Sequence, residues 1–121
     1  MDLPQTLHGQ LYLLAYDREE HRFGIYNHSL FGFALRAAML TDLYLTGYLE
    51  DKGGKPYPSS SACPGDPVLR AAFERVGTSR QEAWAGLIAE DPKRASQVVR
   101  DQLQATGWLC VQRPPLLGII P

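Results

Sequence analysis

The chain has 121 residues, of which 45% are hydrophobic and 21% charged, and this predicts a single globular domain with a core of its own. Twelve Lys and Arg stand against thirteen Asp and Glu, so the net charge is −1, and any affinity for phosphate has to come from local clustering. Two cysteines exclude a disulfide framework, and their spacing does not suggest zinc. This cysteine usage fits a reducing compartment best. The N-terminus lacks the basic start and apolar run of a signal peptide.

The first predicted helix covers residues 3–16. Its apolar positions recur at helical spacing and are Leu3, Leu7, Leu11, Leu14 and Ala15. Residues 17–22 are charged and predict a solvated stretch, and residues 23–26 predict a short extended segment.

The central helix is predicted over residues 30–46, with Ser29 as its N-cap and Gly47 as a left-handed residue at its end. It is apolar nearly all round, which is typical of a helix buried by several neighbours. It is too short and too interrupted by charge to be a membrane span. We therefore expect it to be the centre of a small bundle.

Arg36 lies on the packed side of this helix, where a cation is costly unless it is paired. One interpretation is an internal ion pair with a carboxylate. The other is that the side chain leans toward the helix N-terminus, near residues 27–29, and binds an external anion there. The sequence favours neither.

A strand at 48–50, a turn at 51–55 and a return arm at 56–62 predict a hairpin. Pro64–Pro67 supplies a break, a cap and a first-turn proline for a helix that ends at Gly77. Its predicted buried face is Val68, Leu69, Ala72, Phe73 and Val76.

Ser79 and Glu82 predict a capping box for a fourth helix. That helix is expected to bury Ala83, Trp84, Leu87 and Ile88. Asp91 and Pro92 open a last helix with an apolar stripe that ends before Gly107. The stripe is Ala95, Val98, Val99 and Leu103. Residues 108–121 predict two extended arms around a proline turn.

No arrangement of residues predicts catalysis. His8, His21 and His28 show no ligand spacing, the serines lack a nucleophile elbow, and no carboxylate pair suggests acid–base chemistry. We expect no enzymatic activity, no metal and no cofactor.

Two cations occupy an unusual position at the start of the last helix. Lys93 and Arg94 lie in its first turn, where the helix dipole disfavours positive charge. Free backbone N–H groups at a helix start bind anions, and cations there assist them. If Arg36 lies nearby, the three residues predict a phosphate site. The alternative is a pair of exposed basic residues balanced by Asp91.

The tail carries a second unusual feature, the run Leu116-Leu117-Gly118-Ile119-Ile120. As an exposed hairpin arm it would form an apolar patch of the kind that contacts membranes or proteins. As a core strand it would be unremarkable.

Several short motifs, in this order, resemble the Golgi phosphoprotein family. They are Leu11–Asp17, Gly32–Leu43, Gly47–Leu49, Gly65–Leu69, Gly107–Leu109 and Leu116–Gly118. The resemblance extends over essentially the whole chain and covers the first half or more of a typical member. It predicts one helical domain over residues 1–121, truncated at its C-terminus, and the composition resembles that of a bacterial member.

The resemblance implies a mainly α fold, a compact helical bundle with one or two short β-hairpins, and a peripheral membrane protein. Eukaryotic members bind phosphatidylinositol 4-phosphate and retain glycosyltransferase tails at the Golgi. Their lipid pocket uses a tryptophan, an arginine on the central helix and two arginines on a later helix, beside an apolar hairpin.

Arg36 matches the central arginine of that pocket, and Lys93 falls on the first later arginine. The second later arginine falls on Ser96, with Arg94 or Arg100 as substitutes. The tryptophan falls on Asn27, with Tyr26 one residue earlier.

We therefore expect an anionic, phosphoinositide-like headgroup to bind Arg36, Lys93, Arg94, Asn27 and Tyr26. The membrane contacts are expected from Leu116, Leu117, Ile119 and Ile120. The protein would be cytoplasmic and peripheral on a membrane surface, without nucleic acid as a partner, and its clients and oligomeric state stay open.

The alternative is a winged-helix DNA-binding module with Lys93, Arg94 and Arg100 on its recognition helix. The near-neutral charge and the absence of a basic stripe disfavour it. A scaffold without any ligand is a third interpretation.

Overall fold

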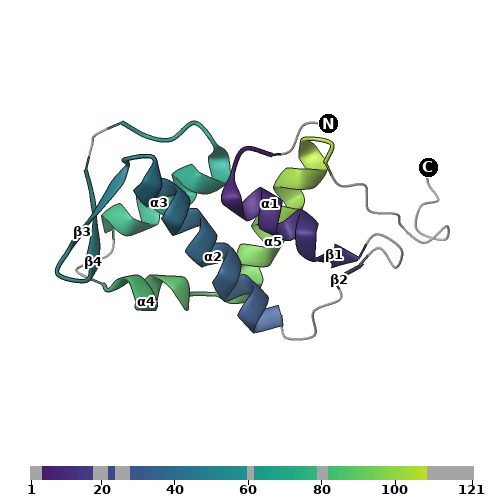
Figure 1. Ribbon diagram of the computed structural model, residues 1–121, viewed down its shortest axis with the longest axis horizontal. Helices are drawn as coiled ribbons and strands as arrows, with labels where there is room; N and C mark the ends of the chain where they lie inside the picture. Colours follow the sequence, from purple (N-terminus) through teal and green to yellow (C-terminus); the bar gives the residue numbers. More distant parts are fainter. Residues whose placement is uncertain (1–3, 18–21, 24–27, 60–61, 79–81, 109–121) are drawn as a thin grey trace.

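The computed structural model describes residues 4–17, 22–23, 28–59, 62–78 and 82–108. Within these residues the fold is mainly α, as predicted, with two short antiparallel hairpins (Figure 1). The elements in chain order are α1 (Leu7–Ala15), β1 (Tyr16–Asp17), β2 (Arg22–Phe23), α2 (His28–Leu45), β3 (Leu49–Lys52), β4 (Lys55–Pro58), α3 (Pro67–Thr78), α4 (Trp84–Ile88) and α5 (Pro92–Ala105).

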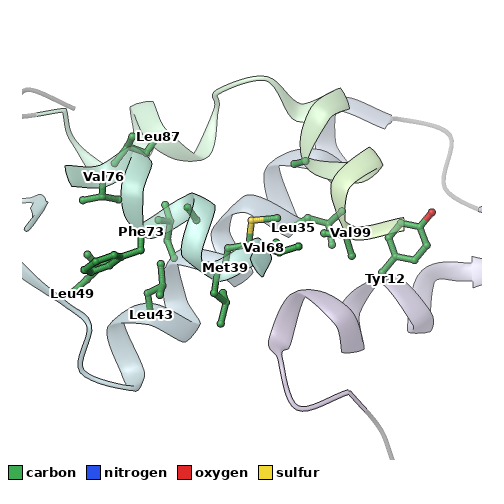
Figure 2. Packing of buried hydrophobic residues seen from close by; sticks show 14 of the residues in the cluster. Tyr12, Leu35, Met39, Leu43, Leu49, Val68, Phe73, Val76, Leu87 and Val99 are labelled. Atoms are coloured by element: carbon green, nitrogen blue, oxygen red, sulfur yellow. The ribbon is translucent and has the colours of Figure 1, made fainter. Parts of the chain in front are cut away.

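The central position of α2 is confirmed. Helices α1, α3, α4 and α5 all pack against it, and the β3–β4 hairpin follows its C-terminal end (Figure 1). Its buried side chains form the middle of a single core (Figure 2). They are Phe31, Leu35, Met39, Leu40 and Leu43. A helix that is apolar over most of its circumference is thus covered on several sides, as its composition requires.

The two later long helices follow the sequence closely. All five residues of the predicted stripe of α3 are buried, and Asp66 caps this helix by accepting hydrogen bonds from the N–H groups of Val68 and Leu69. In α5 the buried residues are Ala95, Val99 and Leu103, whereas Val98 is half-buried. Both helices therefore turn their apolar stripe toward α2.

Helix α1 buries a different face from the one predicted. His8, Gly9 and Tyr12 are buried, and Leu14 is 84% exposed. The reason is a polar chain that the spacing of leucines cannot reveal: His8 Nε2 lies 2.8 Å from Gln102 Oε1, and Gln102 Nε2 donates to Asp66 Oδ2 at 2.7 Å. Because Gln102 donates to Asp66, its oxygen accepts from His8, and this links α1, α5 and the cap of α3.

Several element ends also differ from the prediction. Ser29 lies inside α2, which begins at His28, and Gly77 lies inside α3. Glu82 forms no capping box, because α4 begins after Ala83 without a side-chain cap and Glu82 is instead a partner of Arg75. Gly47 does end α2 in the left-handed region, with φ of +90°.

The predicted hairpin after α2 is confirmed. Leu49 pairs with Pro58 and Lys52 with Lys55, around Gly53 and Gly54, both of which have positive φ. The shorter β1–β2 pair joins the end of α1 to the segment before α2.

Helices α2 and α5 approach closely at Gly32. A Cβ atom built at this position would lie 2.1 Å from the carbonyl oxygen of Pro92, well inside van der Waals contact. Only glycine therefore allows the start of α5 to lie against the second turn of α2.

We expect Gly32→Ala to lower the free energy of unfolding by about 2 kcal/mol, because the backbone of either helix has to move. Gly77→Ala is the matched control: it lies in α3 with no atom within 4 Å of the added Cβ, so it should stabilise the protein by about 0.5–1 kcal/mol. Urea unfolding followed by circular dichroism measures both. Equal stability of the two variants would contradict the close contact.

Candidate functional site

The chain from α4 to α5 runs antiparallel along α2. The rings of Trp84 and Tyr44 are 6.0 Å apart at one end of this run, and Pro92 contacts Gly32 at the other. Arg36 lies between them and reaches the turn that joins α4 to α5. The start of α5 is therefore adjacent to the N-terminal half of α2, as the phosphate-site prediction required.

Arg36 binds backbone carbonyl groups. Its Nη2 donates to the carbonyl oxygens of Glu90 at 3.3 Å and Asp91 at 3.2 Å. Its Nε–H is buried and has no partner in the described part of the chain. The side chain of Arg36 is therefore directed to the turn before α5. Arg36 itself follows Gly32 by one turn of α2.

The carboxylate of Glu90, which belongs to this turn, is bound by a different arginine. Arg75 donates from Nε to both oxygens of Glu90, at 3.0 and 2.9 Å, and from Nη2 to Glu90 and Glu82. These hydrogen bonds to Glu90, together with its charge, raise the pKa of Arg75. The carboxylate of Glu90 therefore binds Arg75, and only its backbone carbonyl group binds Arg36.

Arg36 consequently has no ion pair with a carboxylate of the described residues, which was the first of the two interpretations of this residue. Burial lowers the pKa of its guanidinium, and the negative charges of Glu90 and Asp91 oppose that shift. An arginine remains protonated under such conditions. The structure thus places a half-buried positive charge, held by carbonyl dipoles, at the start of α5.

Asp91 shapes the start of α5. It adopts a left-handed conformation with φ of +38°, and its side chain accepts a hydrogen bond from the N–H of Arg94 at 3.2 Å. Lys93 and Arg94 are both exposed in the first turn. One carboxylate therefore caps a helix start that also carries two cations, with Arg36 adjacent.

The remaining candidate residues divide into two groups. Ser96 is half-buried about one turn into α5. Arg100 is exposed, and its Nε lies 3.6 Å from Asp101 Oδ1. Of the two possible substitutes, Arg94 and Arg100, Arg94 is the one in the first turn of α5. The other candidates lie outside the described residues: Tyr26, Asn27, Leu116, Leu117, Ile119 and Ile120.

The sequence did not indicate the partners of Arg36. Its position among apolar residues signalled a special environment, and Gly32, one turn earlier, marked where another chain segment approaches. The pairing of Arg75 with Glu90 had no comparable signal, since these residues lie on different helices and resemble ordinary surface charges.

Metal ligation and membrane spanning have no basis in the described residues. No group of His, Cys, Asp or Glu there could hold a metal ion. No described helix combines the length and the apolar character needed to cross a membrane.

Comparison with known proteins then places the chain in a family. The family model described as Golgi phosphoprotein 3 (GPP34) matches residues 7–121. The chain belongs to this family. The comparison with curated proteins and that with solved structures gave no match.

Membership of the Golgi phosphoprotein 3 family confirms the resemblance seen in the sequence. The matched range includes Arg36, Lys93 and Arg94 and spans every described helix. Family membership does not assign a role to any single residue. Such roles have to be argued from the geometry at the start of α5.

The left-handed conformation of Asp91 can be tested through stability. Asp91→Ala removes the cap and places a residue without a polar side chain at φ of +38°, so we expect a loss of about 1–3 kcal/mol. Asp91→Asn keeps an acceptor for the N–H of Arg94 and tolerates this conformation, so its loss should stay below about 1 kcal/mol. Urea denaturation distinguishes the two, and equal losses would refute the capping role.

Proposed function

We propose that this protein is a cytoplasmic, peripheral membrane protein that binds an anionic, phosphoinositide-like lipid headgroup. Arg36, Lys93 and Arg94 at the start of α5 contribute the positive charge. The proposal includes no catalytic activity, no cofactor and no metal.

The observation that carries the proposal is the environment of Arg36. Its charge is held at the start of α5 by the carbonyl groups of Glu90 and Asp91, while the carboxylate of Glu90 is bound to Arg75. A cation that has no carboxylate partner among the described residues, beside exposed Lys93 and Arg94, attracts an anion from solution.

The local charge balance also supports a membrane surface. The chain as a whole has a net charge of −1, so an affinity for anionic lipids has to arise from this end of the molecule. Leu30 lies near the beginning of α2, half a turn before Gly32, and is 60% exposed. This exposed apolar side chain, at the start of the helix that carries Arg36, is available to a lipid surface.

The residues outside the described part complete the proposal. Tyr26 and Asn27 precede α2 and would extend the headgroup site, and residues 116–120 would supply an apolar membrane contact. Family membership supports this assignment in general terms. Neither the fold nor the comparisons add support for the DNA-binding alternative.

Vesicle flotation tests the proposal. The wild-type protein should float with vesicles containing phosphatidylinositol 4-phosphate, less with neutral phosphatidylcholine, and less as salt increases. Lys93→Gln combined with Arg94→Gln should reduce binding about tenfold or more, at about 1 kcal/mol for each lost cation. Arg36→Met should reduce it as well.

The matched control is Arg70→Gln, which removes one exposed positive charge from α3 on a residue already paired with Glu74. It should bind vesicles like the wild type. An equal loss in this variant would mean that total charge, not the α5 start, determines binding. Lys93 and Arg94 are exposed, so their replacement tests the site even if Arg36→Met fails to fold.

A change in the opposite direction is also expected. Asp91→Asn removes one negative charge beside Arg36 and keeps the acceptor that caps α5. Its affinity for anionic vesicles should rise by about threefold to tenfold, while its affinity for neutral vesicles should not change. Weaker binding to anionic vesicles, in a folded variant, would contradict a site at this helix start.

A further inference from the structure

A hollow lies along the C-terminal half of α2, between this helix, α4 and β3. It has a volume of about 330 Å³, within the range of small-molecule sites. Three aliphatic side chains line it, those of Ala37, Leu40 and Ile88. Its aromatic end, at Tyr44, lies two helical turns, or about 12 Å, from Arg36. The part of the hollow formed by Tyr44 and Trp84 is therefore distinct from the proposed lipid site.

Two aromatic rings form one side of the hollow. Tyr44 and Trp84 meet edge to face, with an interplanar angle of 87° and a centroid separation of 6.0 Å. Tyr44 is 47% exposed, which is unusual for a large ring beside an apolar hollow. Perpendicular aromatic rings present π surfaces that attract organic cations.

A carboxylate lies on the same hollow and fixes the indole. Trp84 Nε1 donates to Asp51 Oδ1 at 2.6 Å, which leaves Oδ2 of Asp51 without a hydrogen bond to the described residues. The adjacent cation, Lys52, lies 4.0 Å from Glu50 and 5.3 Å from the ring centroid of Tyr57. Successive strand residues point to opposite sides, so Lys52 does not neutralise Asp51.

We propose that this hollow binds a small organic cation of the trimethylammonium type. The aromatic rings and the free oxygen of Asp51 would hold the cationic head, and the aliphatic side chains would cover an attached alkyl part. The charge of Asp51 and the π surfaces favour a cation over a neutral or anionic ligand. The inference does not rest on the proposed lipid function.

The experiment titrates free choline into the full chain and follows the indole N–H signal of Trp84 by NMR. Trp108→Phe serves as the background, because the chain has two tryptophans. The neutral probe is the alcohol in which a tert-butyl group replaces trimethylammonium. Choline should shift the Trp84 signal in a saturable way and bind about tenfold more tightly than the neutral isostere.

Asp51→Asn is the decisive variant, since its amide oxygen still accepts from Trp84 Nε1 while the charge is lost. It should weaken choline binding about tenfold and leave the neutral isostere unaffected. Glu50→Gln is the matched control, with the same change of charge on the neighbouring residue, and should bind choline like the wild type.

A second arm uses phosphatidylcholine vesicles. If Asp51→Asn abolishes their binding, the trimethylammonium group comes from a lipid headgroup; if only free choline binds, it comes from a soluble compound. The absence of binding, equal affinity for choline and its isostere, or equal losses in the Asp51 and Glu50 variants would overturn the proposal. Variants of Lys93 and Arg94 should bind choline like the wild type. The proposal for this hollow and the proposal for the lipid site can therefore be tested separately.

Discussion

The structure depends on how the turn before α5 is held against α2. Two contacts, one helical turn apart, hold it: the backbone of Pro92 packs on Gly32, and the guanidinium of Arg36 binds the carbonyl groups of Glu90 and Asp91. The first contact requires that residue 32 has no side chain. The second requires a long side chain with a planar donor group at residue 36. Because α2 fixes the position of the Glu90–Pro92 segment, it also fixes the first turn of α5, which carries Lys93 and Arg94.

Much of the fold could be predicted because its signals are local. The buried stripes of α3 and α5, the Asp66 and Asp91 caps and the Gly53–Gly54 turn each depend on neighbouring residues and were correctly identified. The buried face of α1 could not be predicted in the same way. It is determined by a hydrogen bond from His8 to a residue 94 positions later, and a histidine in an apolar helix carries no mark of so distant a partner.

The candidate site shows the same division. The sequence identified Arg36 as an anomaly and the start of α5 as a place for an anion, and the structure brings the two together. It could not identify the carbonyl groups as the partners of Arg36, because they belong to residues 54 and 55 positions later in the chain and every residue carries such a group. Nor could it show that Arg75 binds the carboxylate of Glu90, which leaves Arg36 only the carbonyl group of that residue.

The segment from Trp84 to Pro92, which runs antiparallel to α2, also separates charges of opposite sign. At the end near Gly32 the chain contributes Lys93 and Arg94, whereas at the end near Tyr44 it contributes an indole bound to the carboxylate of Asp51. Gly32 and Tyr44 are twelve residues apart, or about 18 Å along the helix. This is about twice the screening length at physiological salt, so the charges at the two ends act almost independently. The proposed anion site and the proposed cation site can therefore share one helix, with the Glu90–Pro92 turn fixed against α2 between the indole of Trp84 and the two cations.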